Sequence, residues 1–374
     1  MIDKKLGLLV LSIGNFGSKG FYNLQEVGLA KALCVYFKEI LVYRLIPYGQ
    51  PKVVEPINNN SKLFLLPSRK IGSNGIPNFS DLDPSIDILI CFSDTQLMFP
   101  KVYSWCKKNN ILLFPYIGVT KSNSRNFFIR LMINFFYLRN LSIYKRVTCF
   151  AKTPFVKGKL EKSGVKDVFL APIGLDIDLM KKDYSEYYPS ELKRSFGFKD
   201  KDKVILFVGR FTAEKKPLDM LSIFQQVYNL DNNYRLLMVG SGELSEKVKY
   251  YIDGLNLKSV VKEIDQIPNA EMWKLYRFAD CFVNLNDHEI YGMAILEALF
   301  YDCKVIAWYA PGPNYLIKNG ISGWLVSNKT ELIDKIIDPN KFNTNNYILN
   351  HFMWDYSSSV VVKVIASFMF LRNQ

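Results

Sequence analysis

The sequence predicts an α/β fold in which two Rossmann-like, doubly wound domains face each other across a cleft. Short apolar runs alternate with helical patterns along the whole chain, which is typical of parallel sheets with crossover helices. The chain has 374 residues, too many for one ordinary core, and its apolar content of 49% is that of a globular protein. In such sheets ligands bind at the carboxyl ends of the strands, so the loops after the strands matter most for function.

Strand-like runs occur in two groups along the chain. In the first half they are residues 6–13, 39–46, 62–66, 87–92, 111–117 and 147–151. In the second half they are residues 203–209, 234–240, 259–264, 280–285, 303–309 and 322–326. The stretch from 170 to 200 is polar and charged with no period, which indicates a connection between domains. We therefore expect domains over 1–172 and 201–352, a connection over 173–200, and a final helix over 353–374 that closes the second domain or crosses back to the first.

Composition argues against several classes of protein. The six cysteines lack paired spacing, which indicates reduced cytosolic thiols, and two histidines leave few ligands for a zinc site. The N-terminal apolar run is too short for a signal peptide and is better explained as a first strand. No segment offers the roughly 20 uncharged apolar residues that span a bilayer. We expect a protein that is soluble or lies on a surface.

Positive charge is concentrated in one region of the first half. Between Lys101 and Leu170 there are 14 Lys and Arg residues against only Glu161 and Asp167, a net charge of +12 out of the +13 of the whole chain. Such asymmetry implies an anionic partner for this region. The candidates are a membrane surface, a phosphorylated substrate and nucleic acid.

Within this region, residues 124–146 read SRNFFIRLMINFFYLRNLSIYKR, a very apolar segment with basic residues inside it and at its ends. The segment is too short and too charged to span a bilayer. It is interpreted either as a helix that lies on a membrane surface beside anionic headgroups, or as an ordinary domain helix packed on the sheet. Nucleic acid fits less well, because no recognition motif accompanies the charge.

A glycine loop follows the first strand. The sequence SIGNFGSKG has glycines at positions 14, 17 and 20 and leads into a helix expected from about Tyr22 to Phe37. Glycines allow close backbone approach, and a helix N-terminus favours anions. The spacing is not that of the dinucleotide fingerprint, so a phosphate-facing loop and a plain tight turn are both open.

A second glycine loop opens the second half, in VILFVGRFTAEKKP. The strand ends at Gly209, and Arg210 and Lys215 follow before the next helix, with Lys216 beside them. Cations at the carboxyl end of a strand suit a diphosphate, and the alternative is a solvated basic loop. The following strand ends in another glycine turn, GSG at 240–242, which is expected to face the same cleft.

The stretch HEIYGMAILEAL places Glu289 and Glu297 on either side of Gly292. A strand is expected to end before it and a helix to begin at the glycine, so that the free amides from Gly292 to Ala294 point at an anion. Glu289 then reaches the reacting end of a ligand. Glu297, on the helix, accepts hydrogen bonds from a pair of hydroxyls such as those of ribose.

In combination these motifs resemble glycosyltransferase family 4, the glycosyl transferases of group 1, which are retaining enzymes of the GT-B fold. The resemblance covers residues 171 to 354 and is weaker in the first half, where it rests on the first glycine loop and the helix with EVGLAKAL. Its motifs are APIGLD from Ala171, Gly209-Arg210, Glu214-Lys215, Gly240-x-Gly242, Glu289-x7-Glu297 and Phe352-x-Trp354.

The resemblance implies a metal-independent hexosyltransferase without a cofactor. It would move a sugar from a nucleotide-sugar donor, with UDP-sugar favoured, to a lipid-linked or other glycan acceptor for a surface polysaccharide such as capsule. The first domain would face the acceptor and an anionic membrane surface, and the second would bind the nucleotide sugar. The expected location is cytoplasmic, peripheral on the inner face of the cell membrane.

The resemblance also implies roles for particular residues. The catalytic residues would be Glu289 on the transferred sugar and Arg210 and Lys215 on the leaving diphosphate, an efficient form of transition-state stabilisation. The other donor-binding residues would be Gly17, Gly209, Ile264, Gln266, Tyr291, Gly292, Met293, Ala294 and Glu297. The acceptor or membrane contacts would be Tyr116, Arg125, Arg130, Arg139, Lys145 and Arg146. Retention is ascribed to attack by the acceptor on the leaving-group face, so no protein nucleophile is named.

Two positions depart from the family pattern. Many members have a histidine after the strand that corresponds to 111–117, where this chain has Tyr116 followed by Ile117 and Gly118. The base-binding loop has Asp265 where relatives often have glycine. A non-catalytic GT-B subunit that binds a glycosyltransferase or a glycan is therefore an alternative. A nucleotide-sugar epimerase is a poorer one, because two histidines are few for proton shuttling.

Overall fold

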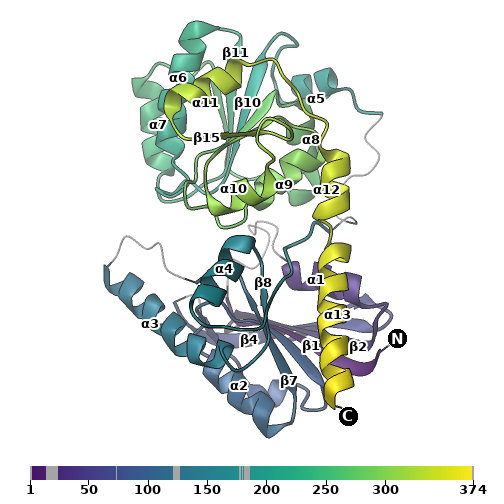
Figure 1. Ribbon diagram of the computed structural model, residues 1–374. Helices are drawn as coiled ribbons and strands as arrows, with labels where there is room; N and C mark the ends of the chain where they lie inside the picture. Colours follow the sequence, from purple (N-terminus) through teal and green to yellow (C-terminus); the bar gives the residue numbers. More distant parts are fainter. Residues whose placement is uncertain are drawn as a thin grey trace. The chain divides into compact units, whose positions relative to one another are not determined.

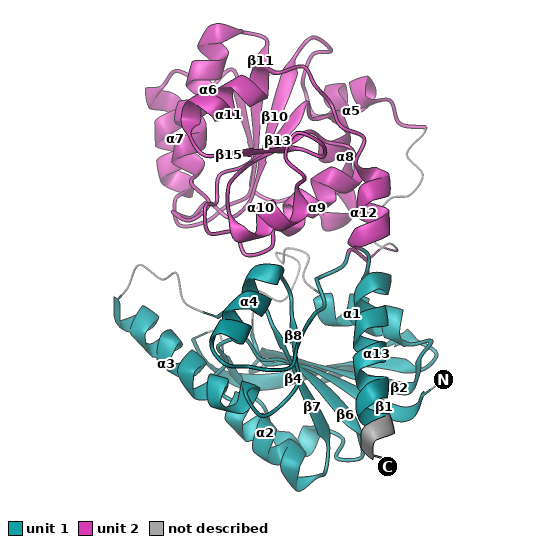
Figure 2. Ribbon diagram, viewed as in Figure 1, with its two compact units in different colours: residues 1–174, 353–374 teal, residues 175–352 magenta. Residues whose placement is uncertain are grey.

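The structure is a computed structural model that describes residues 2–13, 24–72, 74–120, 127–176, 178, 180 and 186–372. The chain divides into two compact units (Figure 2). Unit 1 contains Met1–Gly174 and Met353–Gln374, and unit 2 contains Leu175–Phe352. Each unit is built around one largely parallel sheet flanked by helices (Figure 1).

The sheet of unit 1 has the strand order β3-β4-β2-β1-β6-β7-β8-β9, with β5 paired to β4. Its strands are β1 (Ile2–Val10), β2 (Phe37–Pro47), β3 (Val53–Asn58), β4 (Ser61–Ile71), β5 (Asn74–Ile76), β6 (Ile88–Phe92), β7 (Leu112–Ile117), β8 (Cys149–Ala151) and β9 (Val168–Leu170). All neighbours from β4 to β9 pair in parallel, whereas β3 and β5 pair with β4 antiparallel. From β4 to β8 this is the 3-2-1-4-5-6 order of doubly wound sheets, which reverses between β1 and β6.

The final helix of the chain belongs to unit 1. The helices of this unit are α1 (Gln25–Leu33), α2 (Phe99–Lys108), α3 (Phe127–Tyr144), α4 (Pro154–Lys162) and α13 (Trp354–Arg372), with a 3₁₀ turn at Phe79–Asp81. Helix α13 packs against α1, as Figure 1 shows. Gly28 makes this close packing possible, because a Cβ atom there would lie 2.2 Å from Nε1 of Trp354.

The sheet of unit 2 has the order β12-β11-β10-β13-β14-β15, and every pair is parallel. Its strands are β10 (Lys203–Val208), β11 (Tyr234–Val239), β12 (Val261–Ile264), β13 (Cys281–Asn284), β14 (Val305–Trp308) and β15 (Trp324–Val326). Its helices are α5 (Pro189–Ser195), α6 (Pro217–Leu230), α7 (Ser245–Gly254), α8 (Met272–Phe278), α9 (Met293–Phe300), α10 (Pro311–Leu316), α11 (Lys329–Ile337) and α12 (Asn345–His351), with a 3₁₀ turn at Asn269–Glu271. This is again the 3-2-1-4-5-6 order, and it reverses between β10 and β13.

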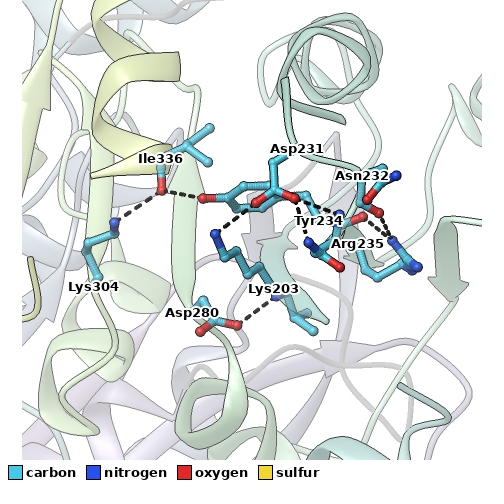
Figure 3. Close-up of polar contacts among 10 residues, drawn as sticks. Lys203, Asp231, Asn232, Tyr234, Arg235, Asp280, Lys304 and Ile336 are labelled. Atoms are coloured by element: carbon cyan, nitrogen blue, oxygen red, sulfur yellow. Dashed lines mark hydrogen bonds and ion pairs between the residues drawn. The ribbon is translucent and has the colours of Figure 1, made fainter. Parts of the chain in front are cut away.

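A polar network closes the amino end of the unit 2 sheet (Figure 3). Lys203 Nζ lies 2.8 Å from Oδ2 of Asp231, and this hydrogen bond is the main reason that the pKa of Asp231 is lowered to about 2. Tyr234 Oη and Lys304 Nζ both donate to the carbonyl of Ile336, at 3.3 Å each. These groups satisfy one another's hydrogen bonds at this end of the sheet. Doubly wound sheets bind their ligands at the opposite, carboxyl edge.

The structure confirms the predicted α/β class with two Rossmann-like sheets. All twelve predicted runs contain a strand, but β3, β5 and β9 were not predicted. The predicted end of the helix expected from about Tyr22 to Phe37 is wrong, because α1 ends at Leu33 and Phe37 begins β2. The stretch interpreted as an aperiodic connection contains α5, which packs against α8.

Candidate active site

The candidate site lies at the carboxyl edge of the unit 2 sheet, where the strand order reverses. Lys215 follows β10 and Glu289 follows β13, the two strands that flank the reversal. Lys215 Nζ lies 2.5 Å from Oε2 of Glu289, and both side chains are largely buried. A crevice at such a reversal is where doubly wound sheets bind their ligands.

The local fold of the first loop explains the position of Lys215. Its amide and that of Lys216 both donate to the carbonyl of Thr212, which closes a turn after β10. Lys216 has a left-handed φ of +57°, and Pro217 then begins α6. This turn directs the two lysines to different partners, since Lys216 Nζ pairs with Asp287 at 2.6 Å.

Asn286 is a site residue that the sequence reasoning missed. It is 1% exposed, and its Nδ2 donates to Oε2 of Glu289 at 3.3 Å and to Oε1 of Glu214 at 3.1 Å. Its Oδ1 accepts from the amide of His288. Glu289 is therefore oriented by an amide as well as an ammonium group. The only sequence signal was a polar residue following a strand.

The second loop leads into α9 through Gly292. This residue has a φ of +101°, a conformation that favours glycine, and it is the N-cap of α9. Gly312 of α10 packs on the same loop, because a Cβ atom there would lie 2.2 Å from the carbonyl oxygen of Tyr291. The amide of Gly312 also donates to the carbonyl of Glu289 at 2.8 Å. The first-turn amides of α9 begin beside Glu289 and are suited to an anion.

Glu297 lies inside α9 and is 9% exposed. Its Oε2 accepts a hydrogen bond from Tyr276 Oη at 3.0 Å, whereas Oε1 accepts none from the described residues. Burial raises the pKa of the Glu297 carboxyl to about 7, although the hydrogen bond from Tyr276 opposes the shift. A carboxylate with one oxygen fixed by the protein retains an acceptor for a ligand hydroxyl.

The glycine turn after β11 packs directly on the turn after β10. A Cβ atom on Gly240 would lie 1.9 Å from the carbonyl oxygen of Gly209, and one on Gly242 would lie 2.7 Å from that of Phe211. Backbone hydrogen bonds join the same turns, from Phe211 to Ser241 at 3.0 Å. The two glycines thus bring the strand-end loops together along one edge.

The remaining predicted donor residues lie on unit 2. Arg210 is exposed at the start of the loop after β10, and Gln266 is exposed after β12. The carbonyl of Ile264 accepts the amide of Gly240 at 2.9 Å, so this residue closes the sheet edge. Met293 and Ala294 form the partly buried first turn of α9.

The residues predicted in unit 1 differ in their burial where the structure describes them. Gly17 and Arg125 lie outside the described residues. Tyr116 is 1% exposed, so its ring is a buried support and not part of a surface. Arg139 donates to the carbonyl of Leu97 at 2.6 Å, which attaches it to the domain. The other three cations are exposed, namely Arg130, Lys145 and Arg146.

The described residues contain no group of three or more His, Cys, Asp or Glu side chains placed to bind a metal ion. None of the helices in these parts of the chain is long and apolar enough to cross a membrane.

Residues 190–343, which include the Lys215–Glu289 pair and α9, match the family described as glycosyl transferases group 1. The match lies within unit 2, so this part of the chain resembles a glycosyltransferase group 1 domain. The matched region runs from α5 to the segment before α12.

Curated relatives resemble the chain over part of their length. The alpha-monoglucosyldiacylglycerol synthase of Acholeplasma laidlawii is 24% identical over 169 residues, which cover 45% of this chain and 42% of the relative. The UDP-Gal:alpha-D-GlcNAc-diphosphoundecaprenol alpha-1,3-galactosyltransferase of Escherichia coli is 27% identical over 197 residues, or 50% of this chain and 49% of the relative. The matches thus span about half of these relatives.

Solved structures resemble the whole chain. HepE of Anabaena, in complex with UDP and glucose, has a TM-score of 0.70 at 16% identity, with coverage of 97% of this chain and 100% of that one. Sucrose-phosphate synthase of Thermosynechococcus elongatus has a TM-score of 0.75 at 15% identity, with coverage of 98% and 100%. At such identity the likeness shows the fold alone, and the fold of both units together is GT-B.

Proposed function

We propose that this protein is a retaining, metal-independent glycosyltransferase. It transfers a sugar from a nucleotide-sugar donor, with UDP-sugar favoured, to a lipid-linked glycan acceptor in the synthesis of a surface polysaccharide. The donor preference is supported by the E. coli relative, whose name specifies UDP-Gal, and by HepE, whose structure contains UDP. The same E. coli name and that of the Acholeplasma enzyme support an acceptor with a lipid.

The observation that carries the proposal is the Lys215–Glu289 pair at the strand reversal of the group 1 domain. A nucleotide sugar presents a diphosphate next to a polyhydroxylated ring. An ammonium group and the first-turn amides of α9 suit the diphosphate, and an adjacent carboxylate suits the ring hydroxyls. The pair provides both an ammonium group and a carboxylate, with Lys215 Nζ 2.5 Å from Oε2 of Glu289.

Lys215 then stabilises the charge that develops on the leaving diphosphate, and the exposed Arg210 adds a second cation on the same loop. Glu289, oriented by Asn286, accepts hydrogen bonds from the transferred sugar. Two cations and a helix N-terminus can neutralise this charge without a metal ion. The acceptor attacks from the leaving-group face, and a donor phosphate oxygen takes its proton.

Glu297 is assigned to the donor ribose. Its Oε1 is available to a hydroxyl while Tyr276 holds Oε2. The position on α9 is eight residues from Glu289, so one short segment contributes to both ends of the donor. The ionised Glu297 carboxylate is a better acceptor for a pair of hydroxyls than the protonated carboxyl group is.

The exposed apolar side chains of α3 support a membrane-associated acceptor. Those exposed by more than half are Phe127, Phe128, Leu131, Phe135 and Leu138. Exposed cations flank them, and the surrounding sequence has a net charge of +12. An apolar helix with basic neighbours suits an anionic membrane surface. We therefore assign the protein to the cytoplasmic face of the cell membrane.

Substitution of Glu289 tests the proposal. Glu289→Ala is expected to reduce transfer by about 10²-fold or more, because it removes a group that contacts the sugar in the transition state. Nucleotide binding, measured by calorimetry, should stay close to that of the unaltered protein. His288→Ala is the matched control, since this neighbouring side chain is 62% exposed.

The Glu289→Ala result distinguishes a catalytic glycosyltransferase from a non-catalytic binding subunit. A non-catalytic subunit would keep its partner or glycan affinity in Glu289→Ala and would release no nucleotide even before substitution. Unfolding of Glu289→Ala, seen by circular dichroism, would instead assign Glu289 a structural role.

A further inference from the structure

Unit 2 has a cavity of about 530 Å³ at the amino end of its sheet, the end opposite to the Lys215–Glu289 pair. Ala279 and Asp280 line it just before β13, and Lys304 lines it just before β14. Its other walls come from α5, the end of α8 and the segments that follow α9 and precede α12. Small-molecule sites in proteins usually measure about 300–1,000 Å³, so this cavity has the size of a second ligand site.

Cations outnumber carboxylates in the lining of this cavity. The lining cations are Lys193, Arg277, Lys304 and Lys341, and the lining carboxylates are Asp280 and Asp302. Asp280 lies 3.2 Å from Nζ of Lys193. Asp302 accepts the backbone amides of Thr344 at 2.6 Å and Asn345 at 2.8 Å. Both carboxylates thus have partners in the protein, and the lining has an excess of two positive charges.

Two of these cations have no carboxylate partner among the described residues. Lys304 is 5% exposed, and its Nζ donates to three backbone carbonyls at the end of α11, those of Lys335, Ile336 and Asp338. Lys341 is exposed and makes no hydrogen bond or ion pair with any residue that the structure describes. Carbonyl dipoles compensate only part of an ammonium charge, so the cavity favours an anion.

Aromatic rings form another part of the wall. Tyr276, Phe278 and Tyr301 line the cavity and are at most 3% exposed, and the half-buried Phe342 lines it too. The rings of Tyr276 and Tyr301 are stacked, with centres 6.2 Å apart and planes inclined by 11°. Rings next to cations suit a ligand that has both a ring and an anionic group. A phosphate monoester carries a charge of about −1.5 to −2 at pH 7, which matches the excess charge of the lining.

Tyr276 connects this cavity with the candidate active site. Its ring lines the cavity, and its Oη donates to Oε2 of Glu297 at 3.0 Å. Helix α9 makes the same connection, because it begins at the loop of Glu289, and Tyr301 and Asp302 at its end line the cavity. A ligand that displaces the ring of Tyr276 also displaces the hydroxyl that holds Glu297.

We propose that this cavity binds a small ring compound with a phosphate group, and that its occupancy changes the affinity of the donor site for nucleotide. The first part stands on the geometry of unit 2 alone. The second part rests on the proposed function, which assigns Glu297 to the donor ribose. Such coupling is reciprocal, since each ligand changes the affinity for the other by the same factor.

Calorimetric titration of phenyl phosphate into the full chain tests the site, with saturating UDP present so that the donor site is filled. Lys341→Glu should weaken binding of phenyl phosphate by about tenfold or more, because it replaces a cation of the lining with an anion. Lys247→Glu on α7 is the matched control. Lys247 is also exposed, has no ion pair with the described residues and does not line the cavity.

Asn343→Trp removes space from the cavity and leaves its charge unchanged. Asn343 is exposed and lines the cavity, so an indole ring at this position fills part of it. The affinity for phenyl phosphate should therefore fall in this variant as well. Thermal unfolding of each variant shows whether the fold is retained. Absence of saturable binding, or equal affinity in the unaltered protein, Lys341→Glu and Asn343→Trp, would overturn the site.

UDP titrations at increasing concentrations of phenyl phosphate test the connection to the donor site. The UDP affinity of the unaltered protein should change by about fivefold and then level off, because coupling saturates whereas competition for one site does not. In Tyr276→Phe, which keeps the ring but removes the hydroxyl, the change should be less than about twofold. A change that never levels off, or one that is equal in Tyr276→Phe, would overturn the second part of the proposal. If the chain binds phenyl phosphate but no nucleotide, the proposed function fails and the site stands.

Discussion

Lys215 and Glu289 neutralise each other across the strand reversal, and Asn286 fixes the carboxylate from a second side. A donor that binds here exchanges this ion pair for contacts with its diphosphate and sugar. The fixed positions matter because preorganised charges stabilise a transition state without further rearrangement. Neighbouring Lys216 is paired with Asp287 and is therefore the natural comparison for Lys215.

Glu297 gives a prediction about pH. Its pKa is raised mainly by burial, to about 7 from the ordinary value of 4.5, so the folded state binds its proton more tightly than the unfolded state. The resulting stability is complete below pH 4.5 and is lost as the pH rises through 7. Glu297→Gln keeps the shape and the acceptor for Tyr276. It should raise the unfolding free energy at pH 8 by roughly 2–3 kcal/mol, with no gain near pH 4.

Chemical denaturation at both pH values measures this difference. Glu271→Gln is a control, because the Glu271 side chain is 43% exposed. Glu297→Gln should also remove any increase of nucleotide affinity with pH, since a ribose hydroxyl prefers the ionised carboxylate. If Glu297→Gln and the unaltered protein had equal unfolding free energies at pH 8, the raised pKa of a buried Glu297 carboxyl would be contradicted.

The sequence indicated which residue types follow which strands, and this was enough to select Lys215, Glu289 and Glu297. It could not show that Lys215 and Glu289 pair across 74 positions, because that depends on the order of the strands. Asn286 was not selected for the same reason. A single polar residue after a strand cannot be recognised as a site residue until its neighbours in space are known.

Among the secondary-structure elements, α3 combines two environments. Its C-terminal part is attached to unit 1, where Asn140 is buried and Arg139 donates to backbone carbonyls. Its N-terminal part exposes side chains on every side, with Phe128 exposed by 78%. Burial lowers the pKa of the Arg139 guanidinium, in keeping with this attachment. Arg139 is thus less suited to lipid contact than Lys145 and Arg146.

We expect Phe128→Ser/Phe135→Ser to weaken binding to anionic vesicles by about tenfold or more, because each exposed phenyl group would otherwise be buried in the interface. Charge reversal at Lys145 and Arg146 should weaken binding at low salt and have less effect at high salt. Vesicle sedimentation measures both effects.

Tyr250→Ser is the matched control, since this aromatic side chain of α7 in unit 2 is 77% exposed. Vesicle binding that is indifferent to both the phenylalanine and the charge substitutions would return α3 to the role of a domain helix.

The long parallel strands were predictable because their apolar runs are buried on both faces. Strand β3 was missed because it is a partly exposed antiparallel partner of β4 and contains Pro56. The three-residue strands β5 and β9 are too short for a periodic signal. Helix α5 was hidden in a charged segment because it buries little more than Leu192 and the stem of Lys193.

At the scale of the whole molecule, the six strands from β4 to β8 in unit 1 and the six strands of unit 2 follow the same order, which reverses between β1 and β6 and between β10 and β13. In unit 2 the reversal brings Lys215 and Glu289 together, with α9 beside them. In this account the diphosphate of the donor is neutralised there.

The most direct measurement is nucleotide release from a panel of UDP-, GDP- and ADP-sugars, with chelator present and a membrane lipid extract as acceptor. The account predicts release from one donor that depends on the extract and is unaffected by the chelator. Release should fall about 10²-fold or more in Lys215→Met and little in Lys216→Met. Release that requires added metal, or that is equal in the two variants, would contradict a site in which Lys215 neutralises the leaving diphosphate.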